Sequence, residues 1–289
     1  MENGPPPERG TLFVVATPLG NLEDLTFRAI RVLRTVSLVA CEDTRRTRRL
    51  LLSQGITTPA TSYFEHNERW KGARILEGLR AGRDIALVSD AGTPGISDPG
   101  YRLVRDARAE GLPVVPVPGP SAAVAALSVS GLPTDRFLFV GFLPPRPKAR
   151  LRELESLRDR RETLVFYESP VRVVACLSDL ASVLGDREGF LCREATKLHE
   201  EYVRGRLSDL RTLLAERAEV KGEIVLVVSG AAEAAAKTIP PEDLGALFER
   251  LVAEGLTRRA AVKEAARRAG LPAREVYSMM EKLKEQRES

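Results

Sequence analysis

Residues 84–103 read DIALVSDAGTPGISDPGYRL: a short apolar run, a loop, and the start of a helical pattern at Tyr101. Glycine and proline recur so densely between residues 89 and 100 that neither a strand nor a helix can continue there. Strand, loop and helix in this order form the repeating unit of a parallel α/β sheet. The stretch therefore predicts an α/β fold with this loop beyond the carboxyl end of a strand.

The same order recurs over the first 118 residues. We expect strands at residues 11–16, 37–40, near Thr61, 84–88 and 113–117, and helices beginning at Leu22, Thr44, Glu68 and Tyr101. Right-handed crossovers would join these strands into a parallel sheet. The proline-rich segment 116–120 interrupts the pattern, because proline does not fit inside a central strand, and we place a domain junction there.

A second group of strands follows the junction. Strands are expected at residues 137–140, 163–167, 189–193, 202–206 and 223–228. Several successive strands have no crossover helix between them, so this second sheet is predicted to be mixed. The sequence thus predicts two α/β domains with a cleft between them.

The two ends of the chain differ in character from these domains. We expect a disordered tail at residues 1–9, domains at 10–118 and 119–230, a linker at 231–241 and a small helical domain at 242–289. Helical patterns on both sides of Gly270 resemble a helix-turn-helix. A helical cap or a dimer contact is the alternative for this piece.

Composition excludes several classes of protein. No apolar stretch approaches the ~20 residues that cross a bilayer, and the N-terminus has no apolar signal core, so we expect a cytoplasmic protein. The 3 cysteines form no CxxC pair and there are only 2 histidines. We therefore expect neither a disulfide framework nor a metal site.

Two carboxylates stand at the ends of the opening loop. No capping or turn rule requires Asp90, so we expect it to contact a ligand, because ligands of open α/β sheets lie beyond the carboxyl ends of the strands. Asp98 has two interpretations: a ligand contact, or the N-cap of the following helix with Pro99 in its first turn.

Four arginines lie within five residues on the helix expected from Asp43 or Thr44. They are Arg45, Arg46, Arg48 and Arg49. Such a cluster suits a phosphate backbone. A solvated helix face is the alternative.

The loops match no phosphate-binding or dinucleotide motif. Instead the strings at residues 16–21, 89–100, 118–122, 168–170 and 221–223 closely resemble the tetrapyrrole-methylase superfamily of S-adenosylmethionine enzymes. The resemblance spans roughly residues 10–230. Within it, CEDTR (41–45), HNE (66–68), FYESP (166–170) and REATK (193–197) resemble one branch, the 16S rRNA (cytidine-2′-O)-methyltransferases, which modify a decoding-centre cytidine.

This resemblance implies S-adenosylmethionine in the cleft, a homodimer, and the 16S rRNA of the small ribosomal subunit as substrate. It implies cofactor contacts by Pro18, Asp90, Ala91, Gly92, Thr93, Ile96, Ser121, Ala122, Phe166 or Tyr167, Glu223 and Ile224. The superfamily more commonly has Gly-Asp-Pro where this chain has Ser89-Asp90-Ala91.

Methylation of a ribose hydroxyl requires a group that activates the hydroxyl, because it is a poor nucleophile at neutral pH. The candidates for a base or a stabilising cation are Glu42, Asp43, Asp98, Glu194 and Lys197. Lys197 could stabilise the alkoxide, bind phosphate, or form only a surface ion pair.

Further residues are expected to bind RNA. We expect Glu194 and Lys197 to line the RNA pocket, and Arg45, Arg46, Arg48, Arg49, His66, Asn67 and Arg193 to contact RNA. Helix capping is the alternative for Asn67.

Two competing functions remain open at this point. A porphyrinoid C-methyltransferase would share the architecture, and its acidic substrate could use the same arginines. A nucleic-acid-binding module without catalysis would explain the arginines but not the cleft loops.

Overall fold

The computed structural model describes residues 9–64, 66–232, 241–269 and 271–288. It divides into two compact units, Met1–Ser229 and Gly230–Ser289, which we describe separately. Most of the expected tail and linker, residues 1–8 and 233–240, lies outside the described residues.

The first sheet of the larger unit is parallel throughout, as predicted, with the strand order β3-β2-β4-β1-β5. Its strands are β1 (Leu12–Val15), β2 (Leu38–Cys41), β3 (Ala60–Ser62), β4 (Ile85–Leu87) and β5 (Val114–Val117). Pro116 lies within β5, and it is tolerated there because β5 is an edge strand that pairs only with β1.

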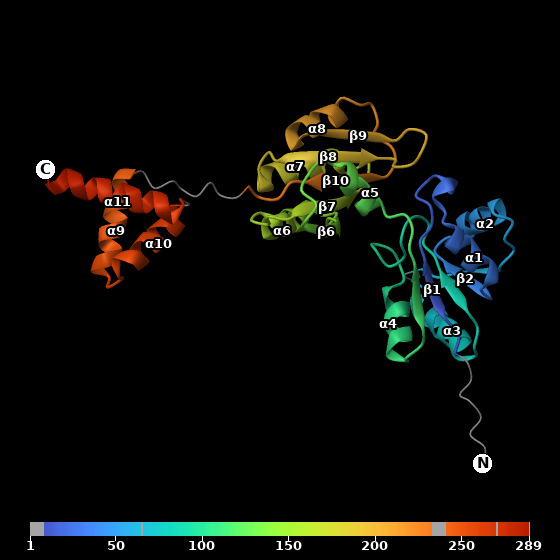
Figure 1. Ribbon diagram of the computed structural model, residues 1–289. Coiled ribbons are helices and arrows are strands. Elements are labelled where there is room, and N and C mark those ends of the chain that lie inside the picture. The colour runs from blue at the N-terminus through green and yellow to red at the C-terminus, as the bar shows by residue number, and fades with distance from the viewer. Residues whose placement is uncertain (1–8, 65, 233–240, 270, 289) are drawn as a thin grey trace, which may run out of the picture. The chain divides into compact units, whose positions relative to one another are not determined.

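Helices cover both faces of this sheet (Figure 1). One face packs against α1 (Phe27–Thr35) and α2 (Thr44–Ser53), and the other against α3 (Glu68–Arg80) and α4 (Tyr101–Ala109). A short 3-10 turn, η1 (Leu22–Asp24), precedes α1. Asp43 caps α2 by accepting a hydrogen bond from the Arg45 amide at 2.8 Å, which fixes the helix directly after β2.

The second sheet is mixed, also as predicted, with the order β6-β7-β10-β8-β9. Only β6 and β7 run parallel, and the other pairs are antiparallel. The strands are β6 (Phe137–Phe142), β7 (Thr163–Glu168), β8 (Glu188–Arg193), β9 (Glu201–Arg206) and β10 (Ile224–Val228).

Four helices accompany this sheet. One face packs against α6 (Pro147–Leu157), α7 (Val173–Leu184) and α8 (Leu207–Ala215), and the other against α5 (Ala122–Val129). Because successive residues of a strand point to opposite faces, the neighbouring strand residues Phe166 and Tyr167 belong to different cores.

The expected N-cap role of Asp98 is wrong. The helix α4 begins at Tyr101, and Gly100 stands at its N-cap position with φ 137°. Such a backbone conformation favours glycine, and it turns the chain into the helix two residues after Asp98. The Asp98 carboxylate is therefore not used by the helix.

The smaller unit contains three helices in its described part: α9 (Pro241–Ala253), α10 (Arg258–Ala269) and α11 (Ala273–Glu288). They share a core that includes Leu244, Phe248, Ala265 and Val276. The helix α10 ends at Ala269 and α11 begins at Ala273, on either side of Gly270, which lies outside the described residues.

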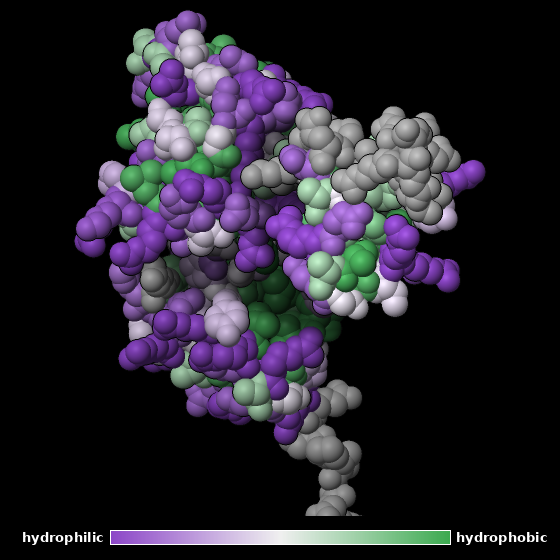
Figure 2. Space-filling model, turned by 90° about the vertical axis from the view of Figure 1, so that its left-hand side faces the viewer, coloured by the Kyte–Doolittle hydropathy of each residue, from purple (hydrophilic) through white to green (hydrophobic). Residues whose placement is uncertain are grey.

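Hydrophilic residues cover most of the surface visible in Figure 2, with smaller apolar areas between them. No helix in the described ranges is long and apolar enough to cross a membrane. The same ranges contain no group of three or more His, Cys, Asp or Glu side chains that could hold a metal ion. All three cysteines are buried and free.

Candidate active site

Three loops meet at the carboxyl edge of the first sheet. The backbones of Thr17 and Gly92 exchange hydrogen bonds of 2.9 and 3.0 Å, which ties the loop after β1 to the loop after β4. The hydroxyl of Thr93 donates to the carbonyl of Pro120 at 3.1 Å, which ties the second loop to the segment leading into α5. These bonds hold residues 89–100 in a defined conformation despite their glycine content.

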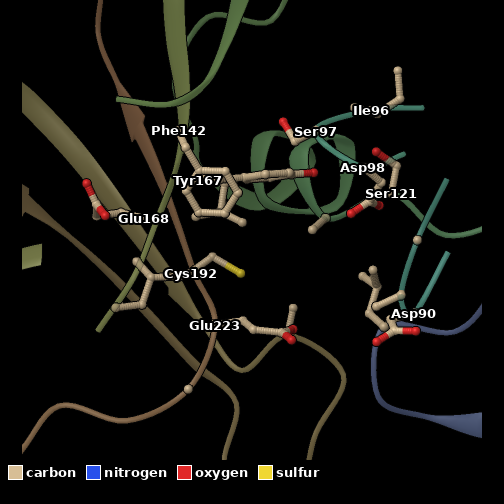
Figure 3. Close-up of a pocket in the computed structure, with 18 of the residues that line it drawn as sticks. Asp90, Ile96, Ser97, Asp98, Ser121, Phe142, Tyr167, Glu168, Cys192 and Glu223 are labelled. Carbon is tan, nitrogen blue, oxygen red and sulfur yellow. The ribbon is translucent and has the colours of Figure 1, made fainter. Parts of the chain in front are cut away.

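A cavity of about 340 Å³ lies beside these loops and is lined from both sheets. Figure 3 shows Asp90, Asp98 and Ser121 on one side, and Tyr167, Phe142 and Glu223 on the other. The predicted residues that line it are Asp90, Ala91, Gly92, Thr93, Ile96, Asp98, Ser121, Ala122, Tyr167, Glu223 and Ile224. Segments more than 100 residues apart in the sequence thus form one site.

Two predicted cofactor contacts do not line the cavity. Phe166 is fully buried in the core between the second sheet and α7, because its side chain points to the opposite face from Tyr167. Pro18 is absent from the lining, and its neighbour Leu19 takes that place. Of the two alternatives Phe166 and Tyr167, only Tyr167 therefore lines the cavity.

Sequence reasoning also missed several lining residues. They are Leu19, Ser97, Phe142, Glu168, Ser169, Pro170, Cys192, Ala195 and Val225, together with Arg46, which was assigned only to RNA. Ser169 and Pro170 lie within a string already quoted from the sequence, so their position could have been found. Nothing local marks Phe142 or Cys192, which are brought in by strand pairing.

One end of the cavity is acidic. Asp90 accepts a hydrogen bond from the Asp43 amide at 3.1 Å and pairs with Arg46 at 3.2 Å. Burial, together with the nearby charge of Glu42, raises the pKa of Asp98 to about 6. Partial burial and the Asp90 charge likewise raise the pKa of Glu42. At this end Arg46 pairs with Asp90, and Asp98 has no ion pair in the part of the chain that the structure describes.

The other end is apolar. The rings of Phe142 and Tyr167 lie 5.6 Å apart in an edge-to-face arrangement. The Tyr167 hydroxyl accepts a hydrogen bond from the Ala123 amide at 3.2 Å, and this fixes the ring against α5. Ile224 and Val225 from β10 complete the wall.

Lys197 lies in an ion-pair cluster beside the cavity. Its ammonium is 2.7 Å from a carboxylate oxygen of Glu194 and 3.3 Å from one of Glu223. Partial burial opposes its charge, but these carboxylates outweigh that effect and raise the pKa of Lys197. At Glu194 partial burial alone would raise the pKa. Hydrogen bonds from the Lys197 ammonium and the Glu223 amide outweigh this effect and lower the pKa of Glu194. The ion pair forms, and Lys197 keeps its proton.

The backbone around this cluster is strained and closely packed. Glu194 and Thr196 have φ angles of 53° and 67°, which side-chain-bearing residues rarely adopt. A Cβ on Gly20 would lie 2.3 Å from Cγ of Lys197, and one on Gly222 would lie 2.3 Å from Cγ of Glu194. The two glycines therefore make room for the Lys197 and Glu194 side chains. Strain of this kind is concentrated at functional sites.

The four arginines of α2 differ in whether a carboxylate within the protein already pairs with them. Arg45 pairs with Asp43 at 2.8 Å and Arg46 with Asp90, whereas Arg48 and Arg49 are exposed. Thr47 and Leu51 on the same helix are buried. The arginines thus lie on the solvent side of α2, as both sequence interpretations required.

Asn67 and Arg193 are engaged within the protein and are poor candidates for RNA contacts. Asn67 is 6% exposed, and its side chain accepts from the Phe64 amide at 2.9 Å. It closes the turn before α3 and makes no side-chain cap to that helix. The Arg193 guanidinium bonds Glu201 and two carbonyl oxygens, at 2.7, 3.2 and 3.3 Å. His66 is exposed.

The sequence model of one protein family, the tetrapyrrole (corrin/porphyrin) methylases, matches residues 11–211 of this chain. The chain belongs to the tetrapyrrole methylase family.

Two curated relatives are each named ribosomal RNA small subunit methyltransferase I. The one from Halalkalibacterium halodurans is 46% identical over 279 residues, which cover 94% of this chain and 95% of the relative. The one from Xylella fastidiosa strain Temecula1 is 48% identical, covering 93% and 98%. The resemblance thus extends over nearly the whole length of both chains.

Solved structures share the family's fold at lower identity. A uroporphyrin-III-C-methyltransferase from Thermus thermophilus is 24% identical with a TM-score of 0.56, covering 76% of this chain and 94% of that one. A cobalt precorrin-4 methyltransferase is 16% identical with a TM-score of 0.58, covering 75% and 94%. Another Thermus thermophilus structure of the first enzyme, with a TM-score of 0.52, contains S-adenosylhomocysteine.

The cavity of this tetrapyrrole methylase fits S-adenosylmethionine by its own chemistry. Its volume falls in the usual range for small-molecule sites, ~300–1,000 Å³. The acidic end suits a cofactor that carries ammonium and sulfonium charges, because Asp90 and Asp98 both line it and burial, with the charge of Glu42, raises the pKa of Asp98. The apolar end, with Phe142 and Tyr167, suits the flat adenine ring.

Proposed function

We propose that this protein transfers the methyl group of S-adenosylmethionine to the ribose 2′-oxygen of a decoding-centre cytidine in 16S rRNA. Methylation of small-subunit rRNA is supported by the relatives of 46% and 48% identity that carry that name. The cytidine and its 2′-oxygen rest on the sequence strings that resemble this branch of the superfamily. The observation that carries the chemistry is the cavity, acidic at one end and apolar at the other.

The proposed cofactor contacts divide by chemistry. Asp90, Ala91, Gly92 and Thr93 hold the methionine and ribose parts, while Tyr167 and Ile224 hold adenine. When bound, S-adenosylmethionine supplies an electrophilic methyl carbon on a positively charged sulfur.

Asp98 is the proposed general base. It lines the cavity, and its pKa of about 6 leaves it ionised at neutral pH yet basic enough to accept the proton of the 2′-hydroxyl on a carboxylate oxygen. Glu42, whose pKa is also raised, is close enough for its charge to raise the pKa of Asp98 further.

Lys197 is proposed to act as a cation, because its raised pKa excludes it as a base at neutral pH. It stabilises the oxygen that loses its proton, and Glu194 holds it in place through the 2.7 Å ion pair. The exposed Arg48 and Arg49 would bind the RNA backbone. Arg45 and Arg46 would bind it as well once a phosphate replaces their carboxylate partners.

The test is transfer of a radiolabelled methyl group to small ribosomal subunits from a strain that lacks this activity, with naked 16S rRNA in parallel. Label on one cytidine 2′-oxygen supports the proposal. Label on neither RNA, with cofactor binding intact, would contradict it and favour porphyrinoid C-methylation, the activity named for structures of 16–24% identity. A cytoplasmic homodimer stays a prediction, and sedimentation of the purified protein would test the dimer.

A further inference from the structure

Two neighbouring helices outside the cavity, α3 and α4, carry aromatic and basic side chains. On α3 these are Arg69, Trp70, Lys71 and Arg74, and on α4 they are Tyr101, Arg102 and Arg105. We call these seven residues the α3/α4 surface. Trp70 and Tyr101 are 53% and 69% exposed, so both rings are open to solvent.

Cations flank the exposed ring of Trp70. The Lys71 ammonium lies 4.8 Å from the ring centroid, and the Arg74 guanidinium carbon lies 5.6 Å from it. The ammonium of Lys71 also donates to the Thr61 hydroxyl at 2.7 Å. A ring with fixed cations beside it can stack on a nucleobase while the cations meet the attached phosphates.

A polar pocket of about 290 Å³ opens between the two helices. Arg69, Arg102 and Arg105 line it, together with Tyr63, Glu68 and Asp106. Arg102 pairs with Glu68 at 3.4 Å and Arg105 with Asp106 at 2.7 Å. The lining thus carries three arginines against two carboxylates, an excess of one positive charge.

The phenol of Tyr63 is the second observation at this pocket. The residue is 1% exposed, and its hydroxyl donates no hydrogen bond within the described part of the chain, although the Leu103 backbone lowers its pKa as a nearby donor does. A buried hydroxyl without a partner costs free energy, and native proteins rarely leave one unpaired. A phosphate oxygen in the pocket would accept this hydrogen bond and the arginine hydrogen bonds together.

The α3/α4 surface adjoins the cavity through the opening loop. Tyr101 is the first residue of α4 and follows directly on the loop that lines the cavity with Asp90 and Asp98. Within that loop Ile96 lines the cavity and is 45% exposed. A strand of nucleic acid whose target nucleotide lies at the mouth of the cavity would meet the N-terminus of α4 next along this loop.

We propose that the α3/α4 surface binds single-stranded rRNA next to the methylated nucleotide, with a base stacked on Trp70 and a backbone phosphate bonded to Tyr63 and Arg69. This inference rests on the proposed function for the identity of the RNA. Charge complementarity favours a polyanion, and the exposed ring favours unpaired bases over a duplex.

Fluorescence tests the stacking directly, because Trp70 is the only tryptophan in the chain. We expect a single-stranded oligoribonucleotide of decoding-centre sequence to quench Trp70 emission, with an apparent Kd that rises steeply with salt. The same oligomer with abasic positions should bind without the quench. Equal emission at saturation by the intact oligomer would overturn the stacking.

Variants test the energetic role. Base stacking on an aromatic ring contributes enough for an increase in Kd of roughly tenfold in Trp70→Ala, while Trp70→Phe should retain most of the affinity. Tyr63→Phe removes an unpaired hydroxyl, so it should leave the melting temperature unchanged or higher and yet weaken RNA binding several-fold. Arg211→Ala, an exposed arginine on α8, is the control.

Methyl transfer to small subunits separates this inference from the proposed function. If the wild type methylates subunits and Trp70→Ala and Tyr63→Phe do so with unchanged KM, the surface proposal fails and the function stands. If Trp70 variants raise KM only on whole subunits and leave the oligomer Kd unchanged, the surface contacts ribosomal protein, and the RNA proposal is overturned. If the wild type methylates nothing yet oligomers still quench Trp70, the proposed function fails on its own.

Discussion

The Asp98 carboxyl group titrates near pH 6 because burial and the charge of Glu42 both disfavour its ionised form. We expect kcat/KM to rise as pH increases through about 6 and to level off above it, since the base must be deprotonated. Asp98→Asn should lower kcat by about 100-fold and remove this rise. A pH profile of both proteins checks this, and an Asp98→Asn enzyme with wild-type kcat would contradict the assignment.

The same raised pKa has a consequence for stability. The folded protein binds the Asp98 proton more tightly than the unfolded chain does, so this group stabilises the fold at low pH, and the contribution is lost as pH rises through about 6. Asp98→Asn should therefore raise the stability at pH 8 by ~1 kcal/mol, after allowance for partial solvent exposure, and change it little at pH 4. Thermal unfolding at both pH values measures the difference.

Lys197 provides a second test at single-residue scale. Lys197→Ala leaves the Glu194 and Glu223 carboxylates without the cation that lies 2.7 and 3.3 Å from them. We expect turnover on small subunits to fall at least about tenfold, and Lys197→Arg to recover part of it because the charge is kept. Wild-type turnover by Lys197→Ala would show that the lysine forms only a surface ion pair.

At the scale of elements, the segment before β10 depends on glycine for two separate reasons. Gly222 has φ 94°, and a Cβ there would also lie 2.3 Å from Glu194. Gly185 has the similar φ of 86° with nothing within 4 Å of its Cβ position, so it is a control for a positive φ without the close contact.

We predict that Gly222→Ala destabilises the protein by ~1–3 kcal/mol more than Gly185→Ala and weakens S-adenosylmethionine binding, because Glu194 and the lining strand must move. Denaturant unfolding and calorimetric titration of both variants give the comparison. Equal effects of the two substitutions would mean that the contact with Glu194 has no consequence.

At the scale of the whole molecule, the cavity belongs entirely to one unit. Its lining runs from Leu19 to Val225, within Met1–Ser229, whereas the helices of the smaller unit have their own core. A chain ending after Ser229 should therefore bind S-adenosylmethionine with a Kd within about threefold of the full chain, since no lining contact is lost. Calorimetry on the shortened chain tests this, and loss of binding would show that the helical unit supports the cavity.

Local patterns were sufficient for the order of the elements. Apolar runs bounded by glycine and proline located the strands, and the missing crossover helices identified the mixed sheet, because both properties depend on residues close together in the chain. The loop at residues 89–100 was recognisable for the same reason. These features follow from backbone conformation and from side-chain periodicity.

Side-chain roles within those elements required the packed structure. Phe166 and Tyr167 are adjacent and both apolar in body, yet only Tyr167 reaches the cavity, since the side that each occupies depends on the register of β7 with β6 and β10. Asp98 does not cap α4, because Gly100 occupies the N-cap position of that helix. Arg193 forms an ion pair with Glu201 on the neighbouring strand. The chain's local order is set by interactions of a few residues, whereas these assignments depend on contacts between segments far apart, which no short pattern contains.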